Sequence, residues 1–125
     1  MNTTNKEIAQ NNEIIAVFMG RVIPEDKLEF YDENPTTHFY NSNWNWLMEV
    51  VEKIEQTTIK ETYGQFNEKE SNAIVSVVIE NKFCQILSNG IYLNEIISEN
   101  EETKIKAVYN ACLEFIKWYN EQNKV

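Results

Sequence analysis

The stretch "AIVSVVIENKFCQIL", Ala73 to Leu87, organises the rest of the chain. Its first eight residues are rich in Val and Ile, which favour β-strands, and Asn81 with Lys82 is typical of a tight hairpin turn. The residues from Phe83 onward then form the return strand. Because apolar residues occupy both faces of the first strand, we expect it to be central in its sheet and covered on both sides.

Weaker strand signals flank this hairpin. "TIKETYGQF", Thr58 to Phe66, alternates loosely and predicts a preceding strand, which the polar loop "NEKES" follows. After the hairpin, "SNG" interrupts the pattern. "IYLNEII", Ile91 to Ile97, then predicts either a last short strand or a loop packed on the core.

The first of three amphipathic segments predicts a helix over residues 6–19, with Gly20 where a left-handed residue commonly follows a helix. Residues 21–37 contain both prolines and many turn-forming residues, so only two short strands are predicted nearby, "KLEFY" (27–31) and "HFY" (38–40). The apolar side of the helix comprises Ile8, Ile14, Ile15, Val17 and Phe18.

The second helix is predicted to begin after Ser42 or Asn43, whose side-chain oxygen would cap it, and to end near Gln56. At about 100° per residue, Trp46 and Val50 point away from its apolar stripe. We expect that stripe to contain Trp44, Leu47, Met48, Val51 and Ile54.

For the third helix, Ser98 with Glu101 fits a capping box, and Thr103 is the alternative start. Acidic residues near its start and lysines in its later turns suit the helix dipole. Its stripe contains Ile105, Val108, Tyr109, Cys112, Phe115, Ile116 and Tyr119. Trp118 lies off this stripe, as Trp46 lies off the previous one. Either each helix buries a wide arc, or these rings are exposed anchors for a partner.

This order of elements predicts an α+β fold: a single-domain layered α/β sandwich with a small, mostly antiparallel sheet and three helices. A chain of 125 residues suits one domain, 1–125, in which residues 1–5 are expected to be disordered.

The formal charge of −9 argues against general nucleic-acid binding and against anionic membrane surfaces. It leaves a basic protein partner or mimicry of nucleic-acid charge, although acidity also simply keeps a small protein soluble. The sequence shows no signal-peptide pattern and no run of about 18 apolar residues. With Cys84 and Cys112 far apart in the chain, we expect a cytosolic protein with reduced thiols and without a cofactor.

Few residues suggest catalysis. His38, the only histidine, follows Asp32 and Glu33 by a few residues, but a metal site needs three or four convergent ligands, so we interpret it as a surface-loop residue. We interpret Cys84 and Cys112 as small buried side chains rather than nucleophiles. Neither a Walker A nor a GxGxxG motif is present. A hydrolase would depend on a pair of surface carboxylates, for which the candidates are Glu25, Asp26, Glu29, Asp32, Glu33, Glu95, Glu99, Glu101 and Glu102. The chain is therefore predicted not to be an enzyme.

Three blocks resemble, in the same order, segments of small phage and prophage proteins of the phage ABA-sandwich type: "NNEIIAVFMG" (11–20), "YNSNWNWLMEVVEKIE" (40–55) and "AVYNACLEFIKWYN" (107–120). The resemblance covers most of the chain and is weaker in the middle strands. Glu49 stands where that family's pattern has proline. The resemblance implies a layered α/β/α sandwich and an origin in phage, prophage or their hosts. It supplies no catalytic residues.

Two functions follow as hypotheses. The first is a non-enzymatic accessory protein that binds a host or phage protein, or a second copy of itself, around Trp46, Val50 and Trp118. The alternative is an anti-defence protein that inhibits a host immune protein or sequesters a nucleotide signal. Aromatic rings would then stack on the base, and the cations Arg21, Lys27 and Lys60 would hold its phosphates.

Overall fold

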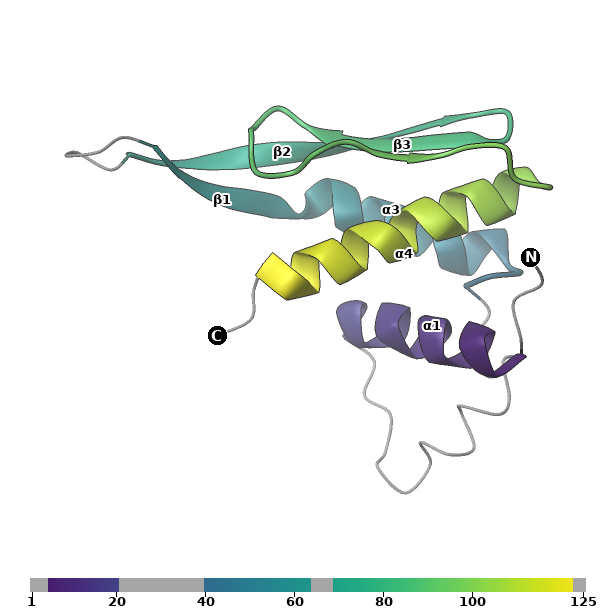
Figure 1. Cartoon of the computed structure of the whole chain (residues 1–125). Coiled ribbons are helices and arrows are strands. Elements are labelled where there is room, and N and C mark those ends of the chain that lie inside the picture. Colours follow the sequence, from purple (N-terminus) through teal and green to yellow (C-terminus); the bar gives the residue numbers. More distant parts are fainter. Residues whose placement is uncertain (1–4, 21–39, 64–68, 123–125) are drawn as a thin grey trace, which may run out of the picture.

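The computed structural model describes residues 5–20, 40–63 and 69–122, in which a four-stranded sheet rests on three helices (Figure 1). The elements are α1 (Asn5–Phe18), α3 (Trp44–Gln56), β1 (Thr58–Tyr63), β2 (Lys69–Glu80), β3 (Phe83–Ser88), β4 (Ile96–Ser98) and α4 (Lys104–Gln122). The α+β class, the antiparallel sheet and the three helices are confirmed.

The helices form two layers on one side of the sheet. α3 and α4 pack against the strands, and α1 packs beneath them (Figure 1). Within the described ranges no helix covers the opposite side. The α/β/α order implied by the family resemblance is therefore not found there.

Some predictions fall outside the described residues. These include the strand at 27–31 and most of the strand at 38–40, of which Tyr40 is described and lies in a turn. Of the N-terminal segment expected to be disordered, Asn5 is described and begins α1.

The strands form an antiparallel meander in the order β1-β2-β3-β4. β1 pairs with the first half of β2, from Lys69 to Ile74, and β3 pairs with the second half, from Val75 to Glu80. The predicted central position of this strand is confirmed. The prediction of a loop at 69–71 is wrong, because pairing with β1 outweighs the weak strand propensity of those polar residues.

The segments before and after β3 agree with the sequence pattern. Glu80 pairs with Phe83 across a two-residue turn in which Asn81 has φ +51°, as predicted for a tight hairpin. Beyond β3, both alternatives for residues 91–97 are partly realised. Leu93 is buried in irregular chain, and β4 begins at Ile96.

The two faces of the sheet differ in burial. Its inner face, toward the helices, includes Ile59, Glu61, Ala73, Val75, Cys84, Ile86 and Ser98, all of them buried. On the outer face, Ile74 is 58% exposed, and Val78 and Ile97 are each 42% exposed. The prediction that β2 is covered on both sides is wrong. A strand can be central through hydrogen bonds to two neighbours without a second layer above it.

α3 begins and ends as predicted. The Asn43 carboxamide oxygen accepts hydrogen bonds from the backbone N–H of Asn45 at 2.9 Å and of Trp46 at 3.3 Å, which identifies it as the N-cap. At the other end, the Thr57 hydroxyl donates to the carbonyl of Lys53 at 2.7 Å.

The apolar stripe of α3 is rotated relative to the prediction. Trp44 and Met48, assigned to the stripe, are 39% and 40% exposed, whereas Val50, assigned away from it, is fully buried. Trp44 is the first helical residue and lies at the edge of the core, so it was a poor guide to orientation. The buried residues of α3 are Leu47, Val50, Val51 and Ile54.

α4 starts at the later of the two predicted positions. The Thr103 hydroxyl accepts a hydrogen bond from the Lys106 N–H at 3.2 Å. The predicted capping box is wrong, because Ser98 is buried in β4 opposite Cys84. The Glu101 carboxylate accepts a hydrogen bond from the side-chain amide of Asn110, in the second turn of α4, at 2.9 Å.

The charge distribution predicted for α4 is also wrong. No acidic residue lies in its first turn and no basic residue in its last, because the helix begins after Glu102 and continues beyond Lys117. It buries a wide arc: besides most of the predicted stripe, of which Ile105 and Tyr119 are only half-buried, Ala107, Ala111 and Leu113 are buried.

α1 ends at Phe18, and Gly20 follows with φ +80°, as predicted. Val17 is 64% exposed, although the sequence pattern placed it on the apolar side. The buried face of α1 is narrower than expected and consists of Ala9, Asn12, Ile15 and Ala16.

Polar contacts join the middle of α1 to the early parts of the other two helices. Buried Asn12 of α1 donates to the Asn41 carboxamide, just before α3, at 3.0 Å. The Tyr109 hydroxyl, near the start of α4, donates to Asn12 at 2.9 Å. Burial raises the pKa of Tyr109, so this hydroxyl stays a donor at neutral pH.

Contacts at Phe18 join the later turns of the same helices. Its carbonyl accepts a hydrogen bond from the Lys53 ammonium of α3, and its ring meets that of Tyr119 of α4 edge-on, with centroids 6.0 Å apart. Along α1, Asn12 contacts the early parts of α3 and α4, whereas Phe18, which comes later, contacts their later turns. The three helices therefore run in the same direction (Figure 1).

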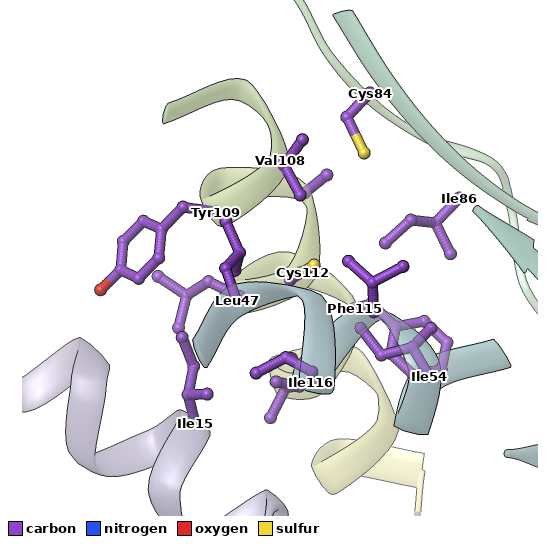
Figure 2. Close-up of a cluster of buried hydrophobic side chains, with 14 of the residues drawn as sticks. Ile15, Leu47, Ile54, Cys84, Ile86, Val108, Tyr109, Cys112, Phe115 and Ile116 are labelled. Atoms are coloured by element: carbon purple, nitrogen blue, oxygen red, sulfur yellow. The ribbon is translucent and has the colours of Figure 1, made fainter. Parts of the chain in front are cut away.

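Side chains from every layer meet in one core. Figure 2 shows Cys84 and Ile86 of the sheet facing Val108 and Phe115 of α4, with Ile54 of α3 beside them. Fully burying an aliphatic or aromatic side chain contributes about 1.5–3 kcal/mol. This shared core therefore holds the sheet to the helices from one side only.

Candidate binding surfaces

Two of the proposed anchors on α3 belong to the interior. Val50 is fully buried. Trp46 is half-buried, and its ring meets the buried ring of Tyr40 edge-on, with centroids 5.2 Å apart. Both residues therefore support the fold, and the sequence pattern was wrong to direct Val50 away from the core.

Trp118 is also half-buried, with its ring centroid 6.0 Å from that of Phe115. Trp46 lies near the start of α3 and Trp118 near the end of α4, so parallel helices place them at opposite ends of the helical layer (Figure 1). They form no common aromatic centre. The more exposed tryptophan is Trp44.

A cleft of about 400 Å³ brings two candidate residues together where the end of α4 approaches β1. Trp118 and Lys60 line it, together with Tyr92 and Tyr119. Because Ile59 is buried on the inner face, the side chain of Lys60, the next residue, points to the outer face. The three aromatic residues share the lining of this cleft with the polar residues Thr58, Asn72 and Gln122. The other candidate cations, Arg21 and Lys27, lie outside the described residues.

The outer face of the sheet carries a group of apolar side chains around Gln85. Val78 is directly opposite Gln85, which is directly opposite Ile97, so these three side chains form a row across three strands. Phe83 and Leu87 lie on the same face of β3, on either side of Gln85. We call this set the outer patch: Val78, Phe83, Gln85, Leu87 and Ile97.

The Glu95 carboxylate contacts the outer patch, where it accepts a hydrogen bond from the side-chain amide of Gln85. Among the outward positions whose side chains the structure describes on the four strands, only Lys60 and Glu80 are charged. Ile74 extends the apolar surface along β2. Apolar surface that no other part of a protein covers commonly marks an interaction site.

Glu61 is fully buried on the inner face of β1, where its carboxyl group holds the loop after β3. Its two oxygens accept hydrogen bonds from the backbone N–H groups of Ile91 at 2.9 Å and Tyr92 at 3.1 Å. A Cβ on Gly90 would approach one of these oxygens to 2.2 Å, so the loop requires glycine there. This carboxyl group shapes the loop rather than facing a substrate.

The two cysteines lie in the interior, as predicted. Cys84 and Cys112 are buried and unbonded to each other, and burial raises the pKa of the Cys84 thiol to about 11. Burial, with a smaller contribution from Cys84, raises the pKa of Cys112. His38 lies outside the described ranges, within which no group of acidic, cysteine or histidine side chains is placed to hold a metal ion. No described helix is long and apolar enough to cross a bilayer.

The sequence pattern missed the outer patch and Ile74. Apolar residues on both faces of β2 were interpreted as burial on both sides. The same pattern equally fits a strand with one apolar face buried and the other exposed. The useful signal was the small number of helices. α1, α3 and α4 form two layers on one side, and within the described chain no helix remains for the other.

Comparison with protein-family models, with curated proteins and with solved structures finds no match for this chain.

Proposed function

We propose that this chain is a small non-enzymatic accessory protein of phage or prophage origin that acts in the host cytoplasm by binding another protein through the outer patch. The observation that carries the proposal is the exposure of Ile74, Val78 and Ile97 on a face that no described helix covers. The phage origin depends on the sequence resemblance alone.

The chemistry of the surface indicates the kind of partner. The side chains of the outer patch are apolar except for Gln85, so the patch suits an apolar surface of another protein. The chain as a whole carries a formal charge of −9. A partner with an apolar centre and a basic rim would be steered toward the chain, and added salt would slow association more than it weakens the apolar contact.

The test compares charged substitutions on the two sides of the molecule. Val78→Asp and Ile97→Asp change the outer patch, and Val17→Asp is the matched control, because Val17 is exposed on α1 in the far layer. Each variant is first shown to be folded by circular dichroism. Binding of the purified partner, isolated by capture on the wild-type chain, is then measured by calorimetry.

We expect the two outer-patch variants to weaken binding by about 30-fold or more, the range of an interface hot spot, and Val17→Asp to leave it unchanged. Equal affinity of Val78→Asp and wild type would contradict the proposal. So would a partner that lacks basic residues around its contact surface.

One observation favours the nucleotide-binding alternative. The cleft beside the end of α4 places Trp118 and Tyr92 around a volume of about 400 Å³, which is within the usual range for small ligands. A nucleotide that stacks on these rings would raise the melting temperature of the wild-type chain. Trp118→Leu would abolish that increase. A panel of mono-, di- and cyclic nucleotides with no effect on the melting temperature removes this alternative.

A further inference from the structure

One edge of β4 has no strand partner within the described chain. β4 is the last strand of the sheet, and it pairs with β3 along its other edge only. Ile97, at the centre of β4, is also exposed. Strand edges that are left open in this way are templates for pairing with an extended segment of another chain.

The backbone groups that face this open edge belong to Ile97. The N–H of Asn89, at the end of β3, donates to a carbonyl of β2 at 3.2 Å. Successive residues of a strand direct their backbone groups to opposite edges, so Cys84, an odd number of positions earlier, directs its groups toward β4. Cys84 pairs there with Ser98. Ile97 is the residue before Ser98, and its N–H and C=O groups therefore point to the open edge.

A groove follows this open edge, between β4 and α4. It consists of two adjoining hollows of about 510 and 380 Å³, which share Ile97 on the strand side and Glu114 on the helix side. Leu93 and Trp118 line the first hollow, and Leu113 lines the second. Because side chains alternate along a strand, an extended segment paired with β4 would direct every second side chain into this groove.

The charge of the groove indicates a basic occupant. Among its lining residues the only cation is Lys117, whereas four residues carry carboxylates: Glu95, Glu99, Glu101 and Glu114. Complementary charge across an interface favours encounter with the right partner and disfavours the wrong one. The net charge of −9 on the whole chain acts in the same direction, because it steers positively charged segments toward the surface.

We propose that this groove binds an extended basic segment of a partner protein, which adds to β4 as an antiparallel fifth strand of the four-stranded sheet. Opposite residues of an antiparallel pair direct their side chains to the same face. The partner residue opposite Ile97 therefore exchanges two hydrogen bonds with it and places its side chain on the outer face. The residues on either side of it face the groove, where lysine or arginine would lie against Glu114. The recognised pattern is thus an alternation of outward apolar and inward basic residues.

The groove is separate from the outer patch, although Ile97 belongs to both. Strand addition uses the backbone of Ile97 and the carboxylates beside α4, whereas the outer patch uses side chains that point away from the sheet. Val78 lies on β2, which β3 separates from β4. Val78→Asp should therefore weaken binding at the outer patch and leave the affinity of the groove for a basic peptide unchanged. Either proposal can fail without the other.

The probe is a synthetic peptide of seven residues that alternates lysine and valine, with lysine at both ends and both termini capped. Its affinity for the chain is measured by fluorescence anisotropy of the labelled peptide at physiological salt. Two further peptides carry N-methyl groups, one on every valine nitrogen and the other on every lysine nitrogen. All three peptides have the same charge, but the two sets of methyl groups lie on opposite edges of an extended strand.

We expect the valine-methylated peptide to bind about tenfold or more weakly than the lysine-methylated one, because it lacks the N–H group that bonds to Ile97. Glu114→Lys should weaken binding of the unmodified peptide about fivefold or more. Glu52→Lys is the matched control: it makes the same change of charge at an exposed position of α3, and it should weaken binding about twofold at most.

Three outcomes overturn the proposal, with both variants first shown to be folded by circular dichroism. The first is equal affinity of the two methylated peptides, which would indicate attraction by charge without strand pairing. The second is an equal effect of Glu114→Lys and Glu52→Lys, which would place the peptide elsewhere on the chain. The third is the absence of saturable binding of the unmodified peptide below about 1 mM.

Discussion

Replacing Gly90 with alanine tests whether the Glu61 carboxyl group holds the loop after β3. A Cβ at residue 90 would lie 2.2 Å from a Glu61 carboxyl oxygen and 2.7 Å from the Cβ of Ala73. Both neighbours are buried, so neither can move aside without disturbing the pairing of β1 with β2. The Glu61 oxygens would be displaced from the N–H groups of Ile91 and Tyr92, to which they are hydrogen-bonded.

The expected loss has two parts. Overpacking of a buried site costs about 1–3 kcal/mol. Weakening two hydrogen bonds adds about 1 kcal/mol rather than the full value, because Ile91 and Tyr92 are exposed and their N–H groups can turn to water. We therefore expect Gly90→Ala to lower the free energy of unfolding by about 3 kcal/mol and the melting temperature by about 10 °C.

Urea unfolding measures this loss, and two comparisons identify its cause. Gly20→Ala is the control: Gly20 has φ +80° but nothing within 4 Å of an added Cβ, so we expect a loss of about 1 kcal/mol from the backbone alone. In a Glu61→Ala background, Gly90→Ala should cost at least about 1 kcal/mol less than in the wild type. Equal losses in both backgrounds, or a loss no larger than that of Gly20→Ala, would refute the reasoning.

Four further outcomes are expected. Trp46→Ala should cost about 2–3 kcal/mol in urea unfolding with no change in solution mass, and a changed mass would restore its role as an anchor. Val50→Ala should cost more than Met48→Ala, and the reverse order would support the stripe that the sequence pattern predicted. Asn12→Ala should cost about 2–3 kcal/mol because it leaves buried partners unsatisfied, so a loss below about 0.5 kcal/mol contradicts that network. Since burial raises the pKa of the Cys84 thiol to about 11, its stabilising effect is full below about pH 8.5 and is lost as the pH rises toward 11. Rapid reaction of native protein with a thiol reagent at pH 8 would show that the site is open.

Local signals predicted the elements well. A capping asparagine and an amphipathic run placed α3 at its observed bounds, and Gly20 marked the end of α1. The hairpin at Asn81 was readable because its turn chemistry lies within two residues. Each of these features depends on neighbours in sequence, which is why the sequence alone is sufficient for them.

Features that depend on tertiary packing were not predictable in the same way. α4 is capped by Thr103 rather than by Ser98, because Ser98 pairs with β3 as part of β4. Strand pairing of this kind is not visible in a local sequence pattern. Val50 is buried and Trp44 is exposed, the reverse of the prediction, because the orientation of a helix about its axis is set by what it packs against. The open outer face depends on where all three helices lie, so the candidate site shifted from the helices to the sheet.

The central claim is that the outer face of the sheet, rather than a helix, is where this chain meets a partner, and residue-resolved NMR of the methyl groups with the purified partner tests it most directly. We expect the signals of Val78, Leu87 and Ile97 to change on binding and that of Val17, exposed on α1, to stay unchanged. Unchanged signals for all three outer-patch residues, or a change confined to Val17, would contradict the account.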